Sequence, residues 1–157
     1  MIRIHLPGRD HTLELSKLVL DVNGTLATDG ILEKGVAEKI TGLKERLDVY
    51  LLTADTFGTA EEIAEELEIE VFKVDEENAA QDKLDFVNAL ESGQCAVIGN
   101  GYNDHLMFEA AALSIAVIGR EGACGKSLLA ADIVVNNILD ALDLIGIHAR
   151  LIATLRG

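Results

Sequence analysis

An aspartate follows the first strongly apolar run of the chain. Residues 18–20 are Leu-Val-Leu, Asp21 comes next, and a turn containing Gly24 and Thr25 follows. Such a run is typical of a buried strand, so a carboxylate, turn amides and a hydroxyl would meet at one strand end. A carboxylate there can attack phosphorus, because a cation and N–H groups can neutralise the transferring phosphoryl group. A turn-capping aspartate is the alternative, and these residues alone do not decide between the two.

A second apolar run ends in small polar residues. Thr53 and Ala54 follow residues 50–52. Small side chains leave room for a phosphate group, and a threonine hydroxyl can donate a hydrogen bond to it. Thr53 and Thr56 could equally cap the helix that follows, which is the more common role of such residues.

A lysine and an amide-rich loop complete the set of candidates. Lys83 stands near the start of a predicted helix, where its ammonium could face a phosphoryl oxygen or the nucleophilic carboxylate. Lys73, at the end of a predicted strand, is the rival candidate. Asn100, Asn103 and Asp104 lie in a loop with two glycines, which suits oxygen ligation of a hard cation. Asn and Gly are also ordinary turn residues, so a purely structural loop is the alternative.

The elements that must position these residues alternate along the chain. Short Val, Ile and Leu-rich runs are separated by segments in which apolar residues recur every three or four positions, which predicts strands and helices in turn. The predicted strands are 17–21, 48–52, 70–74, 95–99, 113–117 and 132–135. The predicted helices are 35–46, 58–68, 78–91, 104–112, 122–131 and 139–155.

This alternation predicts an α/β fold. The strands lack strict polar alternation, as expected of a parallel sheet with helices on both faces, in three layers as in Rossmann-like proteins. A β-hairpin is expected over 2–6 and 11–15, ahead of the first core strand. No repeat or linker interrupts the sequence, so residues 1–157 are expected to form a single domain. Ligands of such sheets bind at the carboxyl ends of the strands, and each candidate residue lies at one.

Charge and composition restrict the partners. The formal charge of −14 disfavours binding to nucleic acid or to anionic membranes, and no apolar run is long enough for a membrane-spanning helix. No secretory signal pattern opens the chain, which favours a cytoplasmic protein. Cys95 and Cys124 form no CxxC pair, so both are expected to be reduced, buried thiols.

Taken together, these segments resemble, in order, the four motifs of the haloacid dehalogenase-like hydrolases over residues 17–143. The likeness is strongest to the phosphorylation domain of P-type ATPases. It rests on four groups of residues: Asp21 to Thr25; Leu51 to Thr56 with the helix after it; Asp82-Lys83; and Gly99 to Asp104, similar to the GDGxND signature, with residues 110–117 after it.

The resemblance implies a role for each matching residue. Asp21 would form an aspartyl-phosphate, Thr53 would hydrogen-bond the phosphoryl group and Lys83 would stabilise its charge. Mg²⁺ would be held by the Asp21 carboxylate, the Asn23 carbonyl and the Asn100 side chain, with Asp104 acting through water or by orienting the other ligands. The substrate-binding residues would be Gly24, Thr25, Thr53, Ala54, Lys83 and Asn103.

Two positions depart from the family pattern. Asn23 stands where family phosphatases carry an aspartate that protonates the leaving group. The P-type pumps that the chain resembles also lack this aspartate, and they hold a longer-lived phosphoenzyme. Asn100 replaces an aspartate that binds magnesium, so the affinity for the metal should fall. Both departures predict slow turnover.

The chain also has no room for a cap domain between Thr25 and Thr53. The resemblance to capless members implies that it could complete its site as a homo-oligomer. The leading hypothesis is a magnesium-dependent phosphatase acting on an unidentified phosphorylated small molecule or other phosphomonoester. The alternative is a weak or inactive phosphate- or metal-binding regulatory module. A response-regulator-like receiver fits less well, because Asp21 is on the first core strand.

Overall fold

A parallel sheet forms the centre of the computed structural model, which describes residues 1–55 and 57–157. Six strands lie side by side in the order β10 (Ile133–Val135), β9 (Leu113–Val117), β8 (Cys95–Gly99), β3 (Lys17–Leu20), β6 (Asp48–Thr53) and β7 (Glu70–Lys73). Every neighbouring pair is parallel, and Leu18 pairs with Val49 on one side and with Ala96 on the other. All six predicted strands are confirmed within one residue at each end.

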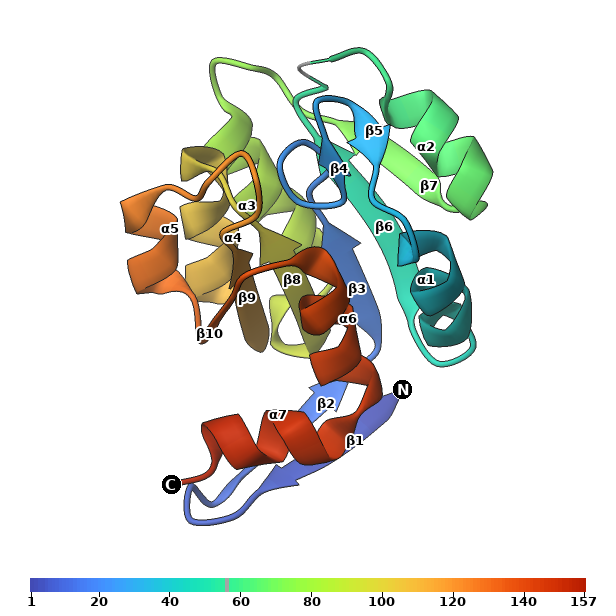
Figure 1. Cartoon of the computed structure of the whole chain (residues 1–157). Coiled ribbons are helices and arrows are strands. Elements are labelled where there is room, and N and C mark those ends of the chain that lie inside the picture. The colour runs from blue at the N-terminus through green and yellow to red at the C-terminus, as the bar shows by residue number, and fades with distance from the viewer. Residues whose placement is uncertain (56) are drawn as a thin grey trace.

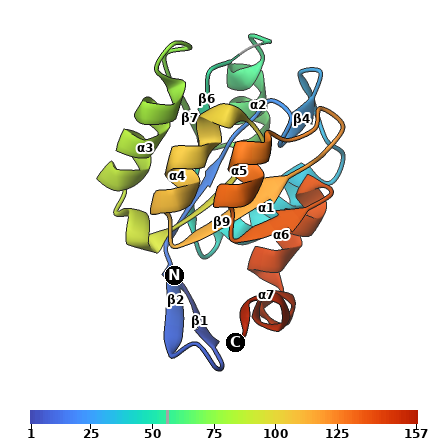
Figure 2. The same cartoon turned by 90° about the vertical axis from the view of Figure 1, so that its left-hand side faces the viewer.

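Helices cover both faces of this sheet (Figure 1). One face carries α1 (Val36–Lys44), α2 (Ala60–Leu67) and α6 (Ile138–Gly146). The other carries α3 (Ala79–Ala89), α4 (His105–Ala110) and α5 (Gly125–Ala130), which lie toward the viewer in Figure 2. Short 3₁₀ turns, η1 (Ser92–Gln94) and η2 (Tyr102–Asp104), precede β8 and α4. The predicted three-layer, Rossmann-like architecture is confirmed.

Two hydrophobic cores hold the layers together. Side chains of a strand alternate between the two faces, so Leu18 and Leu20 join the core under α1 and α6, whereas Val19 joins the core under α3 and α4. All three are fully buried. Burial on both faces explains the apolar sequence of residues 18–20. It also fixes the position of Asp21, which follows directly after β3.

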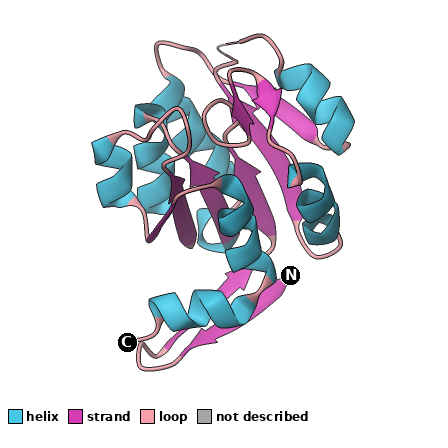
Figure 3. Cartoon of the chain, viewed as in Figure 1, coloured by secondary structure: helices cyan, strands magenta, loops and turns pink. Residues whose placement is uncertain are grey.

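The predicted N-terminal hairpin is confirmed as β1 (Ile2–Leu6) and β2 (His11–Leu15), an antiparallel pair (Figure 3). Its apolar residues face α7 (His148–Leu155), which contacts β1. The prediction of one helix over 139–155 was therefore wrong. The chain turns at Ile147, whose backbone is not helical (φ −110°, ψ 82°), because α6 must pack on the sheet and α7 on the hairpin.

A second, very small hairpin was not predicted. β4 (Ala27–Thr28) pairs with β5 (Ile31–Leu32), and Asp29 and Gly30 form the turn between them. Both turn residues have positive φ, 51° and 79°, the geometry that favours Asp-Gly in two-residue hairpin turns. This hairpin lies beside the carboxyl ends of the sheet strands (Figure 1).

None of the described helices combines the length and the apolar character needed to cross a membrane.

The two cysteines differ in burial. Cys95 on β8 is fully buried, as predicted, and burial raises the pKa of its thiol to about 11. Cys124 is only partly buried, so that part of the prediction was wrong. We expect the Cys124 thiol to react with a chromogenic disulfide under native conditions and the Cys95 thiol only after unfolding, because thiolate formation controls the reaction. Cys124→Ser should remove the fast phase, and loss of that phase in Cys95→Ser instead would contradict the assignment.

Candidate active site

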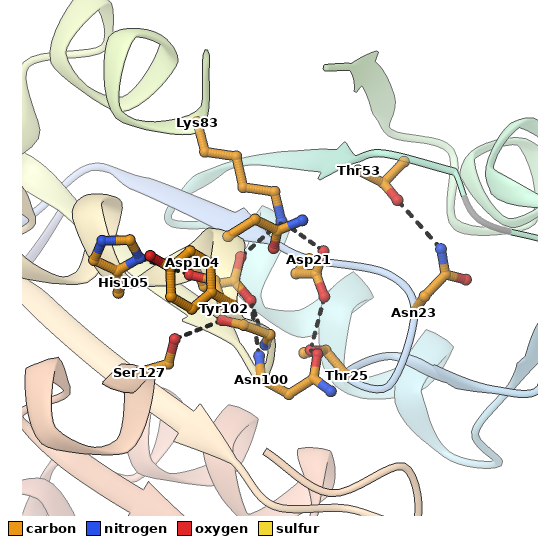
Figure 4. Close-up of polar contacts among 12 residues, drawn as sticks. Asp21, Asn23, Thr25, Thr53, Lys83, Asn100, Tyr102, Asp104, His105 and Ser127 are labelled. Carbon is orange, nitrogen blue, oxygen red and sulfur yellow. Dashed lines mark hydrogen bonds and ion pairs between the residues drawn. The ribbon is translucent and has the colours of Figure 1, made fainter. Parts of the chain in front are cut away.

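Asp21 lies at the carboxyl end of β3 and faces two other charged residues (Figure 4). Its main-chain N–H donates to the Ile98 carbonyl of β8, at 2.9 Å, which extends the sheet by one residue and fixes the aspartate at its edge. The ammonium of Lys83 reaches over from α3 and lies 2.7 Å from Asp21 Oδ1. The same Nζ lies 2.6 Å from Asp104 Oδ1 and 3.3 Å from Asn103 Oδ1. Four predicted site residues therefore meet at one ammonium group.

This cluster carries more negative than positive charge. Burial by itself would lower the pKa of Lys83, but the carboxylates of Asp104 and Asp21 outweigh it and hold that pKa above its usual value. Burial raises the pKa of Asp21 to about 6, against the opposing effect of Lys83, and Asp104 adds to the rise. One ammonium thus serves two buried carboxylates, so the cluster carries a net negative charge when both carboxylates are ionised.

Asp104 uses both of its oxygens inside the protein. Oδ1 pairs with Lys83, and Oδ2 accepts from the N–H groups of Asn100 and Gly101 at 2.9 and 2.8 Å. A Cβ at Gly99 would lie 2.4 Å from Oδ2, so the carboxylate can sit there only against a glycine. Asp104 is fully buried. Its two oxygens thus contact Lys83 and the loop at residues 100–101, and its expected role toward a metal ion stays a prediction.

Thr25 links the remaining oxygens of the site. Its Oγ1 lies 3.1 Å from Asp21 Oδ2 and 3.2 Å from Asn100 Oδ1. The amide of Asn100 donates to the Gly122 carbonyl at 3.1 Å, which turns its oxygen toward Thr25. Gly24 has a φ of +78°, and a Cβ there would lie 2.3 Å from Asn100 Nδ2. The two loops can approach this closely because residue 24 is glycine.

Asp21 Oδ2 and Asn100 Oδ1 thereby both lie next to the hydroxyl of Thr25. Among the described residues, no group of three or more His, Cys, Asp or Glu side chains is placed to hold a metal ion. The donor set fits magnesium nevertheless, because carboxylate, amide and carbonyl oxygens with water are its usual ligands. The Asn23 carbonyl, the third predicted ligand, accepts no main-chain hydrogen bond from a described residue.

Thr53 lines the same pocket as Asp21 and does not cap α2. It is fully buried, its Oγ1 accepts from the Asp55 N–H at 2.9 Å, and Asn23 Nδ2 lies 3.5 Å away. The N–H of Ala60 at the start of α2 donates to Asp55 instead, at 3.1 Å. Thr56, the other candidate cap, lies outside the described residues.

The rival lysine is elsewhere. Lys73 pairs with Asp55 and Glu61, and its side chain is 49% exposed. Lys83 is therefore the lysine that the fold brings to Asp21.

A pocket of about 230 Å³ opens at Asp21, Asn23 and Thr53. Its described lining consists of Asp21, Asn23, Thr53, Ala54, Phe57, Asn100, Gly101, Asn103 and Glu121. A larger groove, about 630 Å³, lies at the sheet edge between α2 and β7, but it holds none of the clustered residues. We therefore take the smaller pocket as the candidate active site. Phe57 and Glu121 were not predicted as site residues. The position of Glu121 shortly after the predicted strand 113–117 was the sequence signal that could have identified it.

We expect Lys83→Met to be strongly destabilising. The substitution leaves two buried carboxylates without their common partner, which typically costs about 3–5 kcal/mol of unfolding free energy. Lys73→Met is the matched control, since an exposed ion pair contributes about 1 kcal/mol or less. Urea unfolding at neutral pH measures both. Equal effects of the two substitutions would show that the buried contacts of Lys83 with Asp21 and Asp104 are not important to the fold.

No family model matches the chain. The structural likeness is instead to solved phosphatases and to the catalytic domain of a CPx-ATPase. The 3-deoxy-D-manno-octulosonate 8-phosphate phosphatase of Moraxella catarrhalis, solved with magnesium, phosphate and KDO, has a TM-score of 0.68 at 18% identity, over 92% of this chain and 95% of that one. The cobalt-bound phosphatase YrbI of Haemophilus influenzae has a TM-score of 0.69 at 20% identity, over 84% and 87%.

The catalytic domain of the CPx-ATPase CopB-B has a TM-score of 0.57 at 26% identity. The match covers 77% of this chain and 46% of that one. The fold of the chain is that of the haloacid dehalogenase-like hydrolases, shared with the P-type ATPase catalytic domain, as the sequence motifs predict.

Relatives by sequence come from Methanocaldococcus jannaschii. One uncharacterized protein is 44% identical over 91 residues, which is 54% of this chain and 98% of that protein. The chain belongs to one family with it. A second uncharacterized protein of the same organism is 56% identical over 39 residues, which is 25% of this chain and 89% of that protein.

Proposed function

We propose that the protein is a magnesium-dependent phosphohydrolase that acts on a phosphomonoester through an aspartyl-phosphate at Asp21. The observation that carries the proposal is the position of Asp21. Its carboxylate lines the pocket while Lys83 and Thr25 hold its two oxygens at 2.7 and 3.1 Å. The phosphatase activity named for the similar structures supports the same chemistry.

The proposed reaction has two displacements at phosphorus. In the first, a carboxylate oxygen of Asp21 attacks, the bond from phosphorus to the leaving oxygen breaks, and that oxygen takes a proton from water. In the second, water attacks the aspartyl-phosphate, the acyl-phosphate bond breaks, and inorganic phosphate leaves. Lys83 and the hydroxyl of Thr53 would stabilise the phosphoryl oxygens. Asn23 can supply no proton, so both steps would be slow.

Magnesium would be held by Asp21, Asn100 and the Asn23 carbonyl. When bound, it would neutralise charge on the phosphoryl group. Because Asn100 contributes a neutral amide oxygen, we propose that the site binds the ion more weakly than one with a second carboxylate.

The test is phosphate release from an aryl phosphate. We expect activity with magnesium and its loss on addition of EDTA, with recovery when excess magnesium is restored. Hydroxylamine, which cleaves acyl-phosphates, should tag the phosphorylated aspartate, and peptide mapping should locate the tag at Asp21. A tag at another residue, or release that is indifferent to EDTA, would reject the mechanism.

A second candidate is a regulatory module that binds phosphate or a metal without turnover. Asn23 and Asn100 favour it, because both remove a carboxylate that the family uses. It predicts that beryllium fluoride with magnesium raises the melting temperature although no phosphoester is hydrolysed. Multiple turnovers with any phosphoester would reject it.

We further propose that residues 1–157 form a single domain, that the protein acts in the cytoplasm on a phosphorylated small molecule, and that copies associate into a homo-oligomer. Light scattering and limited proteolysis test the oligomer and the domain.

A further inference from the structure

Two pocket residues, Phe57 and Glu121, have no part in the proposed phosphoryl chemistry. Phe57 follows β6 and Glu121 follows β9, so they come from strands on opposite sides of β3. Both are exposed, and the Phe57 side chain is 45% accessible. An aromatic ring and a carboxylate that are both open to solvent therefore line the same pocket.

The β4–β5 turn holds both residues at the pocket. The N–H of Asp29 donates to Glu121 Oε2 at 3.2 Å. At the neighbouring residue, Gly30, an added Cβ would lie 3.3 Å from the Cβ of Phe57, so that side chain rests against the turn. The turn therefore contacts both the carboxylate of Glu121 and the base of the Phe57 side chain.

The charge of the pocket selects what can lie there. Its described lining contains two carboxylates, Asp21 and Glu121, and no Lys or Arg. Asp21 is committed to the phosphoryl end, whereas Glu121 has only the turn N–H as a described partner. A carboxylate and an aromatic ring in the lining of one pocket can together bind an organic ammonium group, through ion pairing and cation–π attraction.

We propose that Glu121 and Phe57 bind an ammonium group on the leaving group, so that the preferred substrate is a phosphomonoester of a small amino alcohol. The inference rests on the proposed function for the phosphoryl end of the pocket. A volume of about 230 Å³ is small for a ligand site and accommodates a short chain better than a nucleotide.

The binding test uses analogues that cannot be hydrolysed. 3-Aminopropylphosphonate matches phosphoethanolamine in length, and butylphosphonate is its counterpart with a methyl group in place of the ammonium group. Calorimetric titration with magnesium present should give the amine about tenfold tighter binding, as expected for one ion pair reinforced by a ring. Equal affinities would overturn the proposal whether or not the protein turns over any substrate.

Substitutions assign the preference to its residues. Glu121→Gln keeps an oxygen that can accept from Asp29 N–H, yet it should remove most of the preference, and Phe57→Leu should weaken it by about threefold. Glu66→Gln, on the exposed face of α2, removes one charge elsewhere and should leave the preference intact. Equal losses in the Glu121 and Glu66 variants would assign it to net charge and overturn the proposal. So would weaker magnesium binding in Glu121→Gln with the preference unchanged, since Glu121 would then be a metal ligand.

The kinetic test separates this inference from the proposed function. The ratio of kcat/KM for phosphoethanolamine to that for propyl phosphate should fall about tenfold in Glu121→Gln. Hydrolysis with a ratio near one, or a preference for hydroxyl-rich sugar phosphates, would overturn the inference and leave the phosphatase intact. Absence of all hydrolysis, with the amine still preferred in binding, would reject the phosphatase alone.

Discussion

Asp21→Asn is expected to lower kcat/KM for an aryl phosphate by at least about a thousandfold, because removal of a nucleophile abolishes the covalent route. The fold should survive, since the amide oxygen of asparagine can still accept from Lys83 or Thr25, and Lys83 keeps its contact with Asp104. Initial rates of phosphate release with magnesium measure the effect, and far-ultraviolet circular dichroism checks the fold.

Asp85→Asn is the matched control for this substitution. Asp85 lies on the exposed face of α3, the helix that carries Lys83, and bonds only Gln81 among the described side chains. The same change of charge and chemistry at that position should leave the rate within about twofold of the unsubstituted protein, as is usual for surface substitutions. Comparable activity in the Asp21 and Asp85 variants would show that the carboxylate of Asp21 is not the nucleophile.

The sheet could be predicted because its strands are buried on both faces. Residues 17–20 and 95–99 are apolar almost throughout, and such runs tolerate few other structures. The break between α6 and α7 could not be predicted, because an apolar stripe runs through both helices. The stripe does not reveal that one part packs on the sheet and the other on the hairpin.

The site could be predicted as far as strand ends determine it. Asp21, Thr53 and Asn100 lie at the carboxyl ends of neighbouring parallel strands, so they had to meet at one edge. How Asp104 is used could not be predicted, because its hydrogen bonds depend on the path of the loop at residues 99–104. Glu121 was missed for a similar reason. It is held at the pocket by the turn of the β4–β5 hairpin, whose strands have only two residues each.

Asn23→Asp is expected to raise turnover, by about a hundredfold if the new carboxyl acts as general acid and base. Asn23 lines the pocket, and its Nδ2 lies 3.5 Å from Thr53 Oγ1, a hydroxyl that could donate to a carboxylate in the same place. The substitution changes no volume, so its effect should be chemical. Rapid-quench measurements should show faster breakdown of the aspartyl-phosphate and a smaller burst.

The gain in this variant should depend on position and not on charge. Asn103→Asp adds the same carboxylate to the same pocket, but its oxygen already faces Lys83 at 3.3 Å and is drawn into that ion pair. It should therefore bring no comparable increase. If Asn23→Asp left both turnover and phosphoenzyme lifetime unchanged, the missing proton donor would not be what limits this site. The next cause to test would then be the proposed metal site at Asn100, whose amide oxygen shares the Thr25 hydroxyl with Asp21.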